Sequence, residues 1–387
     1  MQLSRLHKII ILISLCLLAQ LTISWKAWVP INREFPIISA FEFFPVHYGV
    51  FSDGLFLGLL VASLAALIFK PYSKLLIGLV ISIFILLVLE DITRFQPWLY
   101  MYGLMLLSVA FTKPKESEQQ ILFIIRIMLV GTYFWSGIQK FNHAFTVEIF
   151  PWLMHPFGLQ SFFEQHHRLA YGVSLIEIVG SIGLLSRKYQ KYAGIVLIIM
   201  HLILLYALGP LGNSWNKLIW PWNAALIGVL VLLITDKNYD GLVEFTPLIK
   251  SVWFIIVFIL TCIMPAFNFF GCWDYDLSGS LYSGNIPRAE FYFVPNEKNN
   301  VPNSAENIAI ELIVSHSEKE LKIDQWALNE LNTPVYPEER YYVRIGAYLS
   351  GKVAQSSSAF LLIYEKEKFS SKQRVLQIKG DSMTSLK

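Results

Sequence analysis

A lysine at the end of an apolar segment is the first candidate for chemistry in this sequence. The segment covers residues 121–140, and it ends in YFWSGIQK, residues 133–140. Ionisable groups within membrane spans are costly, and they usually face a protein interior or a watery cavity. At helical spacing, one stripe of this segment carries Arg126, Tyr133, Gly137 and Lys140. The sequence therefore predicts a site on this stripe, and the small residues Ser136 and Gly137 would let another helix come close.

Lys140 has two interpretations. Removed from water, its amine can act as a base or as a nucleophile; at the membrane surface, its long side chain would instead extend to the lipid headgroups. Two acids, Glu90 and Asp91, occupy a short turn between apolar segments and are candidates to tune this lysine. Alternatively, they pair with Arg94 and close the turn. The candidate catalytic residues are Lys140, Glu90 and Asp91.

A further acid lies inside an apolar segment. Glu177 stands near the middle of residues 169–185 and shares a helical face with Ser174 and Ser181. Because a charge within a span needs a partner, the sequence predicts a buried ion pair between Arg126 and Glu177. A proton or ligand site at Glu177 is the alternative. His201, alone in its apolar segment, is interpreted as a core histidine with satisfied hydrogen bonds.

Polar and aromatic residues gather where apolar segments end. Residues 213–223, NSWNKLIWPWN, fit either an aromatic belt at the membrane interface or a ligand site. Buried asparagines need hydrogen-bond partners, so they indicate a polar network or a ligand. The candidate ligand-binding residues are Trp135, Gln139, Asn142, Asn216, Trp220 and Asn223. No metal site is expected, because the histidines lack the spacing of metal ligands.

Composition indicates a membrane protein. Of the 387 residues, 55% are hydrophobic and 15% are charged, whereas soluble domains carry about 25% charged residues. The net charge of +3, without a basic cluster, argues against nucleic acid as a partner. The three cysteines are scattered, which excludes a disulfide framework and a CxxC redox pair within the chain.

Apolar segments predict an all-α polytopic membrane bundle. We expect nine transmembrane helices, or eight if one of the weakest segments does not cross the membrane. The segments are 9–25, 54–69, 75–89, 97–111, 121–138, 169–185, 193–208, 218–234 and 252–265. Basic residues beside these segments number eleven on the N-terminal side and six on the other. The positive-inside rule then places the N-terminus in the cytoplasm and Lys140 at the outer face. We expect a bacterial inner (cytoplasmic) membrane as the location.

Residues 269–387 are more polar than residues 1–268 and predict a small second domain, α+β or β-rich, in the periplasm or outside the cell. Strand-like runs cover residues 289–294, 308–314, 360–364 and 375–378. A helix is expected to begin at residues 337–339, where proline and two acids favour a first turn. Its apolar face would consist of Tyr342, Ile345 and Leu349.

The lysine motif supports a family resemblance. Tyr133-Phe134-x-x-Gly137-x-x-Lys140 resembles the motif of the HTTM group, the membrane domain shared with vitamin K-dependent γ-carboxylase. In that enzyme the matching lysine is the proposed base that deprotonates reduced vitamin K. Trp135-Ser136-Gly137-x-x-Lys140 is similar to DoxX-like membrane proteins, some of which are linked to quinone or thiol redox chemistry.

Further motifs look like those of uncharacterised bacterial HTTM-like proteins: LSxxLYSGN at residues 277–285 and WxxxELxxPxYPExR at residues 326–340. The resemblance implies a base role for Lys140. It does not imply carboxylation, because residues 269–387 are too few for a propeptide-binding surface and a larger lumenal portion.

Two functions remain open. The first is a quinone- or lipid-binding site at the outer face near Lys140, in a membrane oxidoreductase or transferase. Its cofactor is open, and a quinone is the candidate. The second is a non-enzymatic assembly, scaffold or transport-associated protein whose outer domain binds a protein partner. Paired spans broken by Gly or Pro, which transporters built from repeats show, are absent from the sequence. The lipid bilayer is an expected partner in both cases.

Overall fold

The computed structural model describes residues 3–44, 48–112, 118–244, 248–311, 318–355, 358–366 and 373–384. It divides into two compact units. The first, which we call the helical unit, comprises Met1–Ile23, Phe56–Ile85 and Gln96–Gly284; the second, the sheet unit, comprises Ser24–Leu55, Leu86–Phe95 and Asn285–Lys387. The sequence predicts one boundary between residues 268 and 269, whereas the units divide after Gly284 and the sheet unit includes two earlier segments.

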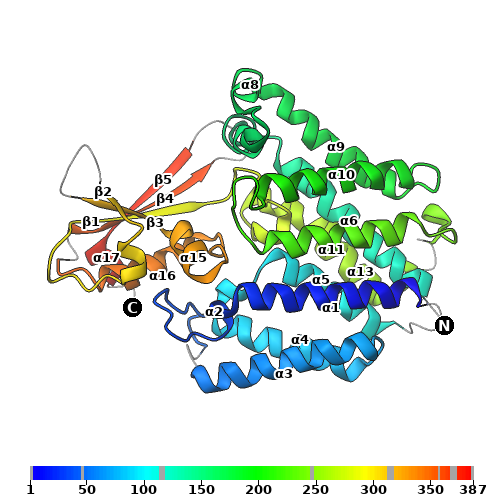
Figure 1. Cartoon of the computed structure of the whole chain (residues 1–387), viewed down its shortest axis with the longest axis horizontal. Helices are drawn as coiled ribbons and strands as arrows, with labels where there is room; N and C mark the ends of the chain where they lie inside the picture. Colours follow the sequence, from blue (N-terminus) through cyan, green and yellow to red (C-terminus); the bar gives the residue numbers. More distant parts are fainter. Residues whose placement is uncertain are drawn as a thin grey trace. The chain divides into compact units, whose positions relative to one another are not determined.

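A helix overlaps each of the nine predicted segments (Figure 1). These helices are α1 (Arg5–Ile23), α3 (Val50–Phe69), α4 (Lys74–Glu90), α5 (Pro97–Phe111), α6 (Glu118–Gln139), α9 (Tyr171–Leu184), α10 (Gln190–Leu208), α11 (Ile219–Ile234) and α13 (Val252–Phe258). Helix α13 continues through a π-turn, Ile259–Ile263, into a 3₁₀ segment, Met264–Phe270.

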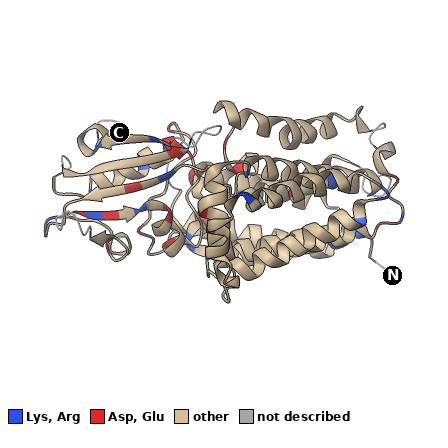
Figure 2. Ribbon diagram, turned by 90° about the horizontal axis from the view of Figure 1, so that it is seen from above, with Lys and Arg blue, Asp and Glu red and all other residues tan. Residues whose placement is uncertain are grey.

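Within the described residues, five helices are long and apolar enough to cross a membrane: α1, α3, α6, α10 and the continuous helix Val252–Phe270. Helices α5 and α11 are also apolar but shorter. Charged residues are sparse along the helices (Figure 2), as a hydrocarbon environment requires. The prediction of a polytopic helical bundle is confirmed at this level.

Short helical turns connect α6 to α9. They comprise a π-turn (Phe145–Ile149), α7 (Phe150–Met154), a 3₁₀ turn (His155–Phe157), α8 (Gln160–Gln165) and a second 3₁₀ turn (His167–Ala170). Two small apolar clusters hold this connection in place. Phe145 and Phe150 pack with Ala170, and Leu153 packs with Ala207, Leu208 and Ile219. The connection is therefore anchored to the ends of α10 and α11.

Among its described residues, the sheet unit contains five antiparallel strands in the order β2-β3-β1-β4-β5. The strands are β1 (Arg288–Phe293), β2 (Ile310–Glu311), β3 (Lys319–Lys322), β4 (Phe360–Lys366) and β5 (Gln373–Lys379). Four of the five overlap the predicted runs, although residues 312–314 of the second run lie outside the described residues. Strand β3 was not predicted, because its sequence KELK offers one apolar side chain.

Helices cover the sheet core. In the register of the sheet, Phe291 of β1 lies between Leu321 of β3 and Leu361 of β4, and all three are buried. Helix α16 (Glu339–Ser350) occupies the predicted position, and its predicted apolar residues are buried. Helix α15 (Ile323–Leu331) buries Trp326, whose ring lies 4.6 Å from that of Phe35. The remaining α-helices in the described part of the chain are α2 (Trp25–Trp28), α14 (Asn303–Glu306) and α17 (Gly380–Thr384).

Candidate functional site

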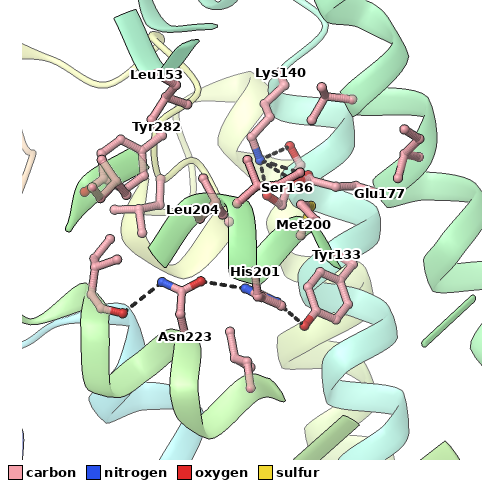
Figure 3. Close-up of a pocket in the computed structure, with 18 of the residues that line it drawn as sticks. Tyr133, Ser136, Lys140, Leu153, Glu177, Met200, His201, Leu204, Asn223 and Tyr282 are labelled. Atoms are coloured by element: carbon pink, nitrogen blue, oxygen red, sulfur yellow. Dashed lines mark hydrogen bonds and ion pairs between the residues drawn. The ribbon is translucent and has the colours of Figure 1, made fainter. Parts of the chain in front are cut away.

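Lys140 and Glu177 form a buried ion pair in the helical unit. The Lys140 ammonium donates to both carboxylate oxygens of Glu177, at 2.8 and 2.9 Å, and to the hydroxyl oxygen of Ser136. The two charged side chains are 9% and 4% exposed. Figure 3 shows them pointing toward each other, Lys140 from just after the end of α6 and Glu177 from α9. The pair is thus a fixed dipole that is largely removed from water. The low local dielectric strengthens its electrostatic interactions with neighbouring groups.

Glycine makes this pairing possible. A Cβ atom at Gly137 would lie 2.7 Å from the Ser174 backbone oxygen and 2.7 Å from a side-chain carbon of Ile178, so α6 and α9 touch at this level. Helical side chains lean toward the N-terminus of their helix. Lys140, one turn beyond Gly137, therefore leans back over Ser136 and reaches the carboxylate of Glu177. The close approach predicted for Gly137 is confirmed.

Below the ion pair, three helices contribute a hydrogen-bonded chain: Tyr133, His201 and Asn223 (Figure 3). The Asn223 amide nitrogen donates to the Ile219 carbonyl, so its amide oxygen faces His201 Nδ1 at 2.6 Å. This arrangement assigns the proton to Nδ1 and leaves Nε2 as the acceptor for the Tyr133 hydroxyl, also at 2.6 Å. Both ring nitrogens are satisfied, which confirms the interpretation of His201 as a hydrogen-bonded core histidine.

A cavity of about 310 Å³ lies beside both polar groups. Its polar wall includes Lys140, Glu177, Ser136, Tyr133, His201 and Asn223, and apolar side chains from α7, α9, α10 and α11 line most of the remainder. The indole of Trp222 also lines it, and among the described residues no hydrogen-bond partner is found for the buried indole nitrogen. An apolar cavity with a few convergent polar groups is the usual form of a small-molecule site.

The predicted ion pair between Arg126 and Glu177 is wrong. The Arg126 guanidinium donates to the carbonyl oxygens of Leu184 and Leu233, at 2.9 Å each, and lies 3.6 Å from the centre of the Tyr239 ring. These carbonyls are at the C-terminal ends of α9 and α11, where backbone acceptors lack helical partners and attract a cation. Arg126 therefore joins two helix ends, while the partner of Glu177 is Lys140.

Glu90 and Asp91 take part in a charge network of the sheet unit. Glu90 binds Arg94 at 2.7 Å, Asp91 binds Arg33 at 2.6 Å, and Arg94 also contacts Asp53 at 3.3 Å. All of these side chains are buried, so the network fixes the turn that follows α4. The alternative interpretation of an ion pair with Arg94 is confirmed for Glu90. The carboxylate that accompanies Lys140 is that of Glu177.

Of the six predicted ligand-binding residues, Asn223 lines the cavity. The indole nitrogens of Trp135 and Trp220 donate to the carbonyls of Cys262 and Leu208. Gln139 donates to the side chain of Asn268. These contacts join neighbouring segments of the helical unit and give the residues a structural role.

The remaining two predicted ligand-binding residues are asparagines that hold backbone groups. The amide oxygen of Asn142 accepts from the Phe145 backbone nitrogen, and its nitrogen donates to the carbonyls of Gln139 and Ser283. The amide oxygen of Asn216 accepts from the Leu218 backbone nitrogen, just before α11. Both are therefore occupied in shaping turns. The polar network that the asparagines predict is found at Asn223.

Sequence reasoning placed Tyr133 on the stripe of the predicted site without counting it among the candidate ligand-binding residues, and it interpreted His201 as a core residue. Tyr133 shares the helical stripe of Lys140, and that spacing is the signal that points to it. His201 offers no such signal in its own segment. Its role depends on how α10 packs against α6 and α11, which only the structure shows.

The comparisons with known proteins agree with part of this description. The DoxX family model matches residues 121–209, a range that runs from α6 to the end of α10 and includes Lys140, Glu177 and His201. No curated protein and no solved structure matches the chain. The matched segment and the apolar helices together indicate a multi-pass membrane protein with a DoxX-like region. The resemblance to the HTTM group stays a prediction.

Proposed function

We propose that this protein binds a lipid-soluble molecule with a hydroxyl-bearing head, and that the head lies against the Lys140–Glu177 ion pair. The observation that carries the proposal is this pair, buried in the wall of an otherwise apolar cavity. Burying two charges is often no more favourable than packing apolar side chains in their place, so a charge pair kept in a cavity wall points to a role beyond stability. A ligand whose polar end meets the pair supplies that role.

The hydrogen bonds in the cavity favour a head that donates. The three ammonium protons of Lys140 are directed at Glu177 and Ser136, and the Tyr133 hydroxyl proton is directed at His201. Lone pairs remain on the Glu177 carboxylate and on the Tyr133 oxygen. The Trp222 indole nitrogen is a buried donor for which no acceptor is found among the described residues. A ligand hydroxyl can donate to Glu177, and another polar atom of the ligand can accept from Trp222 elsewhere in the cavity lining. A quinol ring or a lipid headgroup offers such groups.

This geometry also changes the chemistry proposed for the site. An ammonium that donates to a carboxylate has no free lone pair, so Lys140 stabilises negative charge rather than accepting a proton. Glu177 is then the group that accepts the proton of the bound hydroxyl, and Lys140 stabilises the oxygen that forms. A membrane oxidoreductase or transferase that acts at the outer face would use the pair in this way.

The test is mass spectrometry of small molecules that remain bound to protein purified in nanodiscs. We compare the wild type with Glu177→Gln and Lys140→Ala, and use Lys217→Ala, an exposed lysine before α11, as the control. A hydroxyl-bearing molecule retained by the wild type and the control, and lost from both site variants, would support the proposal. A quinol in the extract would distinguish a quinone site from a lipid headgroup site. Identical bulk lipid in all four samples would refute it.

A further inference from the structure

One side of the cavity is formed by α9 and α10, two helices that converge at one end and separate at the other. A Cβ atom at Gly183 of α9 would come within 2.7 Å of the Ala193 side chain on α10, and one at Gly180 within 3.2 Å of Leu197. The helices therefore touch close to the loop that joins them, as Figure 1 shows. Farther from that loop, α9 and α10 contribute Val173, Met200 and Leu204 to the cavity wall instead.

Four apolar side chains in this region line the cavity and also face outward. They are Ile176 on α9 and Val196, Ile199 and Ile203 on α10, with exposed fractions of 44%, 43%, 51% and 41%. The three on α10 recur at intervals of three and four residues and so form one stripe. Helix α10 is long and apolar enough to cross a membrane, so an outward face on it meets lipid chains. The cavity thus has an apolar edge toward the bilayer.

Resting on the proposed function, we propose that the gap between α9 and α10 is the subsite for the hydrocarbon chain of the ligand, and its entry from the bilayer. The cavity volume of about 310 Å³ is at the lower end of the range for small-molecule sites. It accommodates a ring or a small head, and a long isoprenoid or acyl chain must leave it. The stripe on α10 offers that chain an apolar path, while the polar head stays at the ion pair.

A chemical probe tests this subsite. The probe is a long-chain fatty alcohol with a photoreactive diazirine on its chain, added to the full-length protein in nanodiscs. Labelled residues are mapped by mass spectrometry. We expect labelling of Leu204 and of Leu226, which lines the cavity and is 4% exposed. Ile199→Trp, which fills the gap, should abolish labelling of Leu226, and Ile199→Ala, which widens it, should increase it.

The matched control is Ile195→Trp. Ile195 is on the same helix with 50% of its side chain exposed, close to the 51% of Ile199, and it does not belong to the cavity lining. Its variant should label as the wild type does. Unchanged labelling of Leu226 in Ile199→Trp, or none in the wild type, would overturn the chain subsite. If the wild type retained a molecule that Glu177→Gln lost, the proposed head site would stand even though the chain subsite had been overturned.

Discussion

Removing one partner of the Lys140–Glu177 ion pair is expected to destabilise the helical unit strongly. The charged groups are 2.8 Å apart and their side chains are 9% and 4% exposed, so little solvent can replace the lost partner. Glu177→Gln leaves a buried ammonium without its carboxylate, which typically costs about 3–5 kcal/mol. The assay is unfolding by increasing SDS in mixed micelles, followed by the fluorescence of the 11 tryptophans.

An exposed pair in the same unit provides the control. Arg187 and Asp240 also form an ion pair, but their side chains are 70% and 54% exposed. Asp240→Asn should therefore change the free energy of unfolding by only about 0–1 kcal/mol. The double variant Lys140→Met/Glu177→Gln should recover most of the stability lost in Glu177→Gln, because no uncompensated charge remains. A loss in Glu177→Gln as small as that in Asp240→Asn would refute the burial argument.

Three further predictions follow from single contacts. Gly137→Ala should separate α6 from α9 and cost about 1–3 kcal/mol, measured in the same SDS assay. Gly172→Ala, with nothing near the added methyl, should be tolerated, and equal effects would contradict the close packing. Tyr133→Phe leaves His201 Nε2 buried without its donor and should cost about 1–3 kcal/mol; an unchanged unfolding midpoint would argue against the hydrogen-bonded chain. In the sheet unit, burial raises the pKa of the Asp324 carboxyl to about 7, although Tyr342 donates to it. The unfolded pKa is about 3.9, so the stability contributed by the protonated form is complete below that value and is lost as pH rises through about 7. Hydrogen exchange of residues 318–355, corrected for intrinsic rates, should therefore quicken over this range in the wild type and not in Asp324→Asn; the same pH response in both would contradict this assignment.

The membrane helices could be predicted from the sequence because hydrocarbon imposes a simple rule. Apolar runs must form helices there, since backbone groups find no other hydrogen-bond partners. Helices α5 and α11 begin within one residue of their predicted positions. Strand β3 and helix α15 were missed, because a strand of four residues with one apolar side chain and a helix of nine residues are too short to show a clear pattern. Their positions depend on tertiary packing.

The partner of Glu177 could not be found by counting residues along one segment. Gly137 touches α9 beside Glu177, and Arg126 lies eleven residues before Gly137 in the sequence, or about 16 Å along the helix axis at 1.5 Å per residue. An arginine side chain cannot extend so far. Lys140 lies two residues beyond the predicted transmembrane helix, residues 121–138, but its long side chain leans back by one turn. A position deep within the apolar segment therefore selected Arg126, the wrong partner for Glu177. The direction of the Lys140 side chain explains why Lys140 is the partner instead.

The cavity itself has no signature in the sequence. Part of its wall consists of α9 and α10, which touch at Gly180 and Gly183 and line the cavity farther along. Each helix is apolar throughout, so its pattern does not distinguish a side chain against a neighbouring helix from one beside an open space. Asn223 was predicted as a ligand residue from its polarity. Trp222 was not, because a tryptophan close to other tryptophans is typical of an aromatic belt at the membrane interface.

The most direct test of the proposed site is an electron cryo-microscopy map of the wild-type protein purified in nanodiscs. We predict density that belongs to no protein atom in the cavity, with its polar end within hydrogen-bond distance of Glu177 and its remainder leading toward Ile199. A cavity without such density, or one closed by rearranged side chains of α9 and α10, would contradict a ligand site at the Lys140–Glu177 ion pair.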